Sequence, residues 1–206
     1  MVKRTGKTKH QVRTEETQVR ILDAAEAVFS EQGFDKTQLE EVAARAGYTR
    51  GAIYAHYASK EDLFLALMEQ RVLTRFNIIR RVIESEPQIS KRPGIFREWI
   101  AAQAGDHTWG TLMLEFKLYS LRRPESREKL LHMYEMTART SGIDFIELLF
   151  GAGLEKSERA SAERRLVILG AILSAINLES LFRPKLMSRQ HVQPVLDELF
   201  TALIHA

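Results

Sequence analysis

The side chains best suited to do chemistry in this sequence are Thr49, Arg50, Tyr54 and His56, which lie close together in the chain. Arg50 carries the one guanidinium among them, and a guanidinium can donate two parallel hydrogen bonds to the edge of guanine in the DNA major groove. Ile53 is suited to the buried side of the same helix, which leaves the other four side chains on the exposed side. This segment is therefore a candidate for direct contact with DNA bases.

Two short helices must hold these side chains in place. Thr37 is followed three residues later by Glu40, which is the pattern of a capping box at a helix start. That helix ends at Gly47, a residue suited to a left-handed helix end. Thr49 can cap the next helix only two residues later. Two short helices joined by a tight glycine turn predict a helix-turn-helix.

Gly51 lies in the first turn of the second of these helices. Glycine inside a helix costs roughly 1 kcal/mol relative to alanine, so its presence suggests that another backbone or a base comes close there. The alternative is that a frayed helix end tolerates glycine.

A longer pattern surrounds this pair of helices and closely resembles the DNA-binding domain of TetR-family repressors. Within it, the tract from Thr49 to Tyr57 is similar to the versions found in regulators of multidrug efflux. The resemblance implies a dimeric repressor that binds palindromic operator DNA and is released by a small molecule. The residues that carry it are Ile21 to Ala25, Phe29, Gly33, Phe34, Thr37, Val42, Ala43, Ala46 to Tyr54, His56, Tyr57 and Lys60 to Leu63.

The same resemblance implies contacts to DNA phosphates, which set the register of a protein on DNA without selecting its sequence. Without the family pattern, the sequence predicts that Tyr57 is a half-buried packing residue and that Lys60 is a solvated residue at a helix start. The full set of predicted DNA-binding residues is Thr37, Gln38, Thr49, Arg50, Gly51, Tyr54, His56, Tyr57 and Lys60.

Helical periodicity runs through nearly the whole chain from Thr14, the expected N-cap of the first helix, and no alternating strand pattern interrupts it. We therefore expect an all-α fold. With the family resemblance, this implies an N-terminal three-helix helix-turn-helix domain and a C-terminal helical ligand-binding and dimerisation domain. A helix of about 25 residues follows Ser59, and residues 86–94 form a loop. Later helices are expected at about 94–104, 108–122, 125–150, 162–182 and 189–204.

The chain divides into three predicted parts: a flexible basic tail over residues 1–13, the DNA-binding domain over 14–59, and the ligand-binding and dimerisation domain over 60–206. The tail can follow phosphates or enter a minor groove, and it can equally be a solvated terminus. Its basic residues, all before the first acidic residue, are Lys3, Arg4, Lys7, Lys9 and Arg13.

The segment from Leu166 to Phe182 is apolar nearly all round, and such a helix must be covered on most sides. With the last helix it resembles the pair that forms a four-helix dimer interface in this family, although both helices could also pack inside one subunit. The predicted dimer residues are Leu173, Val192, Leu196, Leu199 and Phe200.

Many aromatic and methionine side chains lie between the two ends of the chain, and at helical spacing most such residues belong to a core. The resemblance implies an apolar ligand cavity among them. The polar candidates Asn177, His107 and Glu115 can each instead make a structural hydrogen bond. We expect an apolar or aromatic effector, cationic if Glu115 faces the cavity. The predicted lining is Phe76, Trp99, Trp109, Met113, Phe116 and Asn177.

Composition argues against several other classes. The chain has no cysteine, which excludes thiol chemistry, and its net charge is only +3. Its six histidines are scattered without the spacing of metal ligands, so we expect no metal site, and we expect no cofactor. We expect a cytoplasmic protein with no signal peptide or membrane span. An enzyme with an apolar cavity and a small-molecule carrier remain alternatives. However, Gly151-Ala-Gly153 lacks the third glycine of a dinucleotide site, no other nucleotide or hydrolase motif occurs, and a carrier has no use for a helix-turn-helix.

Overall fold

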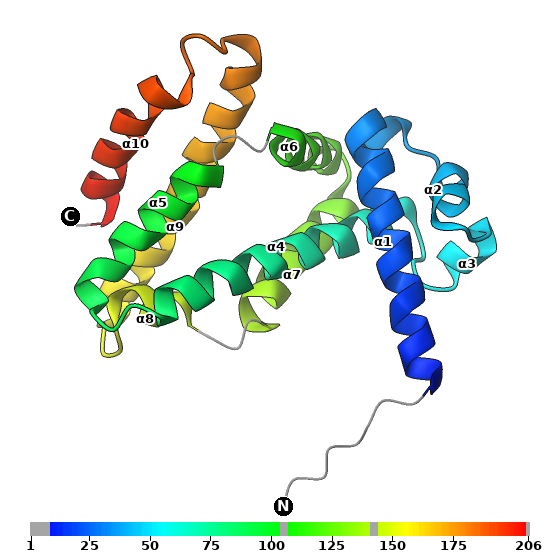
Figure 1. Cartoon of the computed structure of the whole chain (residues 1–206), viewed down its shortest axis with the longest axis horizontal. Helices are drawn as coiled ribbons and strands as arrows, with labels where there is room; N and C mark the ends of the chain where they lie inside the picture. The colour runs from blue at the N-terminus through cyan, green and yellow to red at the C-terminus, as the bar shows by residue number, and fades with distance from the viewer. Residues whose placement is uncertain (1–8, 104–106, 141–143, 205–206) are drawn as a thin grey trace, which may run out of the picture.

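The computed structural model describes residues 9–103, 107–140 and 144–204, and in these ranges the chain is helical with no strand (Figure 1). The prediction of an all-α fold is confirmed. The helices are α1 (Lys9–Lys36), α2 (Leu39–Ala46), α3 (Arg50–Tyr54), α4 (Lys60–Glu84), the 3₁₀ helix η1 (Ile89–Lys91), α5 (Arg92–Gln103), α6 (His107–Leu121), α7 (Pro124–Thr140), α8 (Phe145–Phe150), α9 (Lys156–Phe182) and α10 (Arg189–Ile204).

Helices α1–α3 form one end of the molecule, and α9 and α10 form the opposite end (Figure 1). A first hydrophobic core joins α1, α2, α3, the first part of α4, α6 and α7. At its centre, the ring of Phe34 contacts the rings of Phe64 and Phe116 edge to face, with 5.0 Å between centroids in each pair. This core crosses the predicted domain boundary at residue 59, so the helix-turn-helix is packed directly against the helices that follow it.

A second core lies towards α9 and α10 and is built from the end of α4 with α5, α8, α9 and α10. Ile79 and Ile83 of α4 are fully buried in it, whereas Leu63 and Phe64 of the same helix are fully buried in the first core. Helix α4 therefore links the two cores.

Several helix ends differ from the sequence prediction. Helix α1 begins at Lys9, so residues 9–13 are helical and the predicted flexible tail is too long; residues 1–8 lie outside the described part of the chain. At Gly33 this helix is kinked, with φ 78° and ψ 171°, a backbone conformation that essentially only glycine adopts. The helix expected over 125–150 is two helices, because Asp144 caps α8 by accepting backbone N–H groups of Ile146 and Glu147.

Helix α9 is long and apolar enough, by length and composition, to cross a membrane, although no membrane span was expected from the sequence. Only 11% of its most apolar stretch is buried within the chain. Its exposed apolar residues include Val167, Ile168, Leu181 and Phe182, with exposed fractions of 74%, 48%, 47% and 75%. A surface of this kind on a helix packed at the end of a helical domain calls for a covering partner.

Candidate nucleic-acid interface and effector pocket

Helices α2 and α3 form the helix-turn-helix, at the edge of the molecule (Figure 1). Gly47 ends α2 in the left-handed conformation with φ 75°. Thr49 then caps α3, because its hydroxyl accepts the backbone N–H of Ala52 at 3.3 Å. Ile53 is fully buried and fixes the helix against the first core. The turn and the second helix therefore form as the glycine and threonine spacing predicts.

The opposite side of α3 is exposed and presents Arg50, Gly51 and Tyr54. The Arg50 guanidinium donates to the Tyr54 hydroxyl at 3.0 Å and lies 5.2 Å from the centre of that ring. It also pairs with the carboxylate of Glu40 on α2. The one group suited to read guanine is thus held on the exposed surface by two neighbours, of which Glu40 was not foreseen as a partner.

Gly51 makes no close contact within the protein that requires glycine. A side-chain carbon at this position would meet only the Thr49 hydroxyl, at an ordinary 3.7 Å. The protein itself therefore leaves open space above the first turn of α3.

Thr37 does not act as predicted. It is only 1% exposed, and its hydroxyl donates to the carbonyl of Gly33 at 2.7 Å instead of capping α2. The N-cap of α2 is Gln38, which makes no side-chain capping hydrogen bond, so the capping box with Glu40 is absent. The prediction of a Thr37 side-chain contact to DNA is wrong, because α2 starts one residue later than expected and the Thr37 side chain is buried. Gln38 is exposed.

Lys60 closes the end of α1. Its ammonium donates to the carbonyls of Asp35 at 2.9 Å and Thr37 at 3.2 Å, and it lies 4.8 Å from the centre of the Phe34 ring. An ammonium has three donors, so one remains for a phosphate. Tyr57 is 7% exposed, and burial raises the pKa of its phenol, which therefore stays a neutral hydrogen-bond donor. His56 is half-buried beside it.

Three polar contacts tie α1 and the start of α4 to α6 and α7. The carboxylate of Glu115 on α6 accepts the backbone N–H of Phe34 at 2.7 Å, directly after the kink in α1. The hydroxyl of Tyr119 on α6 donates to Glu61, and Lys129 on α7 pairs with Asp62 at 2.9 Å. Glu115 therefore serves the helix-turn-helix domain. The pocket that it lines, between the end of α1 and α6, contains none of the six predicted ligand residues, so the sequence-based reason to expect a cationic effector falls away.

Four of the six predicted ligand residues come together around a pocket of about 210 Å³, which we name the tryptophan pocket. The other two do not line it: Phe116 is fully buried in the first core, and the Phe76 ring packs 5.2 Å from that of Phe145. Leu173, predicted at the dimer interface, lines this pocket instead. The lining residues are Arg75, Trp99, Ile100, Trp109, Gly110, Met113, Leu173, Ser174 and Asn177.

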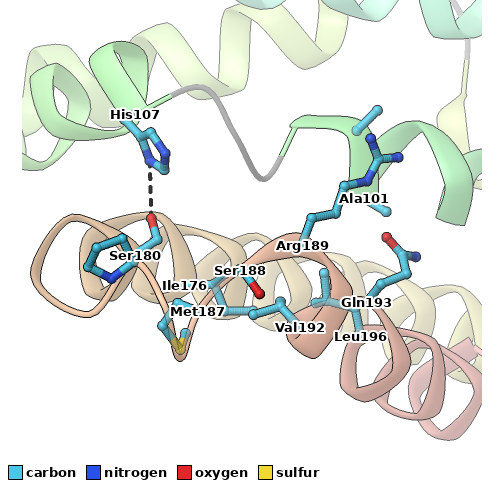
Figure 2. Close-up of a pocket in the computed structure, with 12 residues that line it drawn as sticks. Ala101, His107, Ile176, Ser180, Met187, Ser188, Arg189, Val192, Gln193 and Leu196 are labelled. Atoms are coloured by element: carbon cyan, nitrogen blue, oxygen red, sulfur yellow. Dashed lines mark hydrogen bonds between the residues drawn. The ribbon is translucent and has the colours of Figure 1, made fainter.

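A second pocket of about 280 Å³ lies between α5, α6, α9 and α10, and we name it the α9–α10 pocket (Figure 2). Ser180 donates its hydroxyl proton to the Asn177 carbonyl at 2.7 Å and lies 3.1 Å from Nδ1 of His107. Because that serine proton is already used, Nδ1 of His107 is the donor in the second hydrogen bond. His107 is thus engaged in a structural hydrogen bond, which was the alternative that its sequence left open.

Three of the predicted dimer residues lie inside the subunit. Val192, Leu196 and Phe200 are 9%, 4% and 3% exposed, because α10 turns this stripe towards α5 and α9. Leu199 is half-buried. The prediction is therefore wrong for the three buried side chains: a single apolar stripe on α10 could not show whether it faces its own subunit or another. The exposed apolar side chains near this end lie chiefly on α9, with Val195 on α10.

Comparison with known proteins gives consistent matches. Residues 21–67 match the family model described as "Bacterial regulatory proteins, tetR family". The chain is 41% identical over 93 residues to the HTH-type transcriptional regulator AcrR of Shigella flexneri, a match over 45% of this chain and 41% of AcrR. The chain spans about half or less of the length of the first curated relatives it matches.

Two solved structures share the fold over nearly the whole chain. A putative TetR-family transcriptional regulator from Mesorhizobium loti MAFF303099 is 21% identical with a TM-score of 0.69, and the match covers 94% of this chain and 97% of that one. The multidrug binding protein EbrR, solved in complex with imidazole, is 25% identical with a TM-score of 0.58, and the match covers 97% of both chains.

Proposed function

Because this chain belongs to the TetR family of bacterial transcriptional regulators, we propose that it is a dimeric repressor that binds palindromic operator DNA and is released by a small effector. The observation that carries the proposal is the exposed face of α3, where Arg50 and Tyr54 stand on a helix docked by the fully buried Ile53. A helix of this kind can enter the major groove and place its first turn against base edges.

The proposed DNA-contacting set keeps Gln38, Thr49, Arg50, Gly51, Tyr54, His56, Tyr57 and Lys60, and we assign direct base contact to Arg50. The open space above Gly51 supports close approach of DNA to the first turn of α3. Two such helices in a symmetric dimer would read half-sites about 34 Å apart. We place this activity in the cytoplasm, where the chromosome is.

The effector site that we propose is the tryptophan pocket. Helix α6 lines this pocket with Trp109, Gly110 and Met113, and further along the same helix Glu115 and Tyr119 contact α1 and α4. A ligand that favours one position of α6 would therefore change the contacts of Glu115 and Tyr119 that hold the helix-turn-helix domain in place. By linkage, operator DNA must lower ligand affinity by the same factor, about 5 to 150-fold for a coupling of 1–3 kcal/mol.

The test is a gel-shift titration on the promoter DNA next to the gene, at one stated salt concentration because affinity for DNA depends strongly on salt. We expect tight binding to a palindromic fragment and weak binding to a fragment with the palindrome scrambled. Equal binding to both would contradict sequence-specific regulation, and no binding to either would favour a carrier or an enzyme. Addition of an effector should release the palindromic fragment.

A further inference from the structure

The tryptophan pocket has an aromatic wall built from two different helices. Trp99 comes from α5 and Trp109 from α6, and they are the only two tryptophans of the chain. Met113 of α6 and Leu173 of α9 add apolar surface. The volume of about 210 Å³ equals that of about seven liquid waters at ~30 Å³ each, which suits a single substituted ring.

One amide side chain, that of Asn177, lies in this mostly apolar lining. Its oxygen is buried and has no hydrogen-bond partner among the described residues. Buried acceptors in native proteins are nearly always satisfied, by protein, water or ligand. An unpaired acceptor costs free energy, which a ligand would recover by donating an O–H or N–H group to it.

The amide lies close to α6, because the residue opposite it is Gly110. A side-chain carbon at Gly110 would lie 3.3 Å from Cβ and 3.5 Å from Nδ2 of Asn177, so the amide nitrogen is nearer to α6 than the oxygen is. Rotation about the last side-chain bond of asparagine, whose angle varies broadly, exchanges the two atoms without moving either helix. Since Gly110 and Asn177 both line the pocket, this rotation brings the oxygen to the pocket when a ligand offers a donor.

The lining favours an uncharged ligand. None of the nine described residues that line the pocket is acidic, so a cation finds no carboxylate there. The two guanidiniums beside the Trp109 ring are already engaged: Arg71 pairs with Glu26, and Arg75 contacts other groups of the chain, the Trp109 ring among them. An ionised ligand would lose its hydration in this pocket without a free counter-charge in the lining.

We propose that the tryptophan pocket binds an uncharged aromatic compound that carries one O–H or N–H donor, a phenol being the simplest example. The ring packs against the tryptophan wall, and the donor pairs with the side-chain oxygen of Asn177. This ligand class deepens the proposed function and rests on it, because the same pocket is proposed there as the effector site.

The experiment titrates the full-length protein, without DNA, with four compounds of similar size at pH 7.5 in a calorimeter. 4-Ethylphenol has the donor, its isomer 4-methylanisole has none, acetophenone has only an acceptor, and 4-methylbenzoate is an anion. We expect 4-ethylphenol to bind about 10-fold more tightly than each of the others, the effect of one hydrogen bond. Because both tryptophans of the chain line the pocket, quenching of their fluorescence should accompany binding.

Several results of these titrations would overturn the proposal. One is that any of the other three compounds binds as tightly as 4-ethylphenol. Another is that 4-ethylphenol does not bind. A third is that it binds without quenching, which would place the ligand elsewhere, such as the α9–α10 pocket.

Variants test the contact with Asn177. Asn177→Leu should bind the two isomers equally. Asn77→Leu makes the same change at the only other asparagine of the chain, which is exposed on α4 and does not line the pocket, and it should keep the 10-fold preference of the parent protein. The nearly isosteric Asn177→Asp keeps an acceptor oxygen but has no amide N–H, so it should also prefer 4-ethylphenol. A preference that survives in Asn177→Leu, or one that is lost in Asn177→Asp, contradicts pairing through the amide oxygen.

A gel shift with the same compounds distinguishes this proposal from the proposed function. If 4-ethylphenol binds as expected but does not release operator DNA, the ligand class stands and the effector role of the pocket fails. If 4-methylanisole binds as tightly, quenches the tryptophans and releases the DNA, the effector role stands and the ligand class fails.

Discussion

At the scale of single residues, DNA binding by the exposed face of α3 depends on the contacts that the Arg50 side chain makes within its own chain. In the free chain its guanidinium is shared between the Glu40 carboxylate and the Tyr54 hydroxyl. In the proposed DNA complex, a base edge would replace at least one of these partners. Glu40 would then both orient the guanidinium and compete with DNA for it.

Arg50→Ala should lower affinity for the operator by ~1–3 kcal/mol and relax the preference at one base position in each half-site. Glu40→Gln keeps the side-chain shape but removes the competing charge, so it should strengthen binding to operator and to random DNA alike. Affinities for a panel of single-base operator variants measure both effects. If Arg50→Ala lowers the affinity for all DNA sequences equally, Arg50 contacts phosphate only.

We predict two roles for Lys60, one in holding the end of α1 and one in binding a DNA phosphate, which unfolding and salt titrations can separate. Two of its three donors hold the end of α1, which leaves one for a phosphate. Lys60→Ala should therefore lower the free energy of unfolding by about 1 kcal/mol and also reduce the salt dependence of DNA binding by about one unit of slope. Lys185→Ala, exposed near the far end of the molecule, is the control and should change neither. A loss of stability with an unchanged slope would leave Lys60 with the helix-closing role alone.

At the scale of the elements, the kink in α1 is where the helix-turn-helix domain meets α6. Gly33 adopts φ 78°, and a side-chain carbon there would lie 2.7 Å from Oε2 of Glu115. Gly33→Ala should cost roughly 3 kcal/mol of stability, since backbone strain of 1–3 kcal/mol adds to the clash. Urea unfolding measures it. The cost should be smaller when the same substitution is made in a Glu115→Ala background; equal costs in the two backgrounds would argue against the contact between α1 and α6.

The contribution of the ion pair between Asp62 on α4 and Lys129 on α7 to stability should depend on pH. Burial raises the pKa of Asp62, but hydrogen bonds from Lys129 and Ser59 outweigh it, so the pKa lies below its ordinary value. A carboxyl whose folded pKa is depressed stabilises the protein above the unfolded pKa of ~3.9, and this contribution is lost as pH falls through the folded pKa. Because both side chains are partly exposed, it should be under about 1 kcal/mol.

Lys129→Gln should therefore destabilise the protein at pH 7, and the difference from the parent chain should shrink as pH falls from about 5 to about 3. Urea unfolding at several pH values measures the difference. Lys185→Gln should leave a constant difference. A Lys129→Gln difference that stays constant with pH would mean that the ion pair does not hold α4 to α7 in solution.

The sequence predicts those elements whose structure depends on residues close together in the chain. Gly47 and Thr49 shape the turn between α2 and α3, and the stripe of α4 gives its length. The side of α10 that is buried could not be predicted, because it depends on a helix distant in sequence. The same holds for Glu115, whose partner is a backbone N–H 81 residues away. For the tryptophan pocket, the family resemblance together with the aromatic, methionine and polar candidates predicted four members, but Arg75 carried no local signal.

At the scale of the whole molecule, the exposed apolar face of α9 is the surface at which we expect two copies of the chain to meet in the proposed dimer. Val167, Ala171, Ser174, Leu178 and Phe182 recur at helical spacing along this face, and the small residues in the middle allow a second helix to come close. An exposed apolar surface of this kind on a DNA-binding protein is better suited to a second copy of the chain than to water, since a symmetric dimer matches a palindrome.

A charge placed on this face should therefore separate the subunits. Val167 is 74% exposed in the single chain, so Val167→Glu removes no contact within the subunit and should leave the helical content unchanged. In a dimer the same carboxylate would be buried without a partner, which costs several kcal/mol and should yield monomers in sedimentation experiments. Monomers contact one half-site at a time, so operator binding should fall sharply while binding to random DNA changes less. Leu131→Glu, on the 54% exposed Leu131 of α7, is the matched control and should stay dimeric. If Val167→Glu also sediments as a dimer, the subunits meet through another surface.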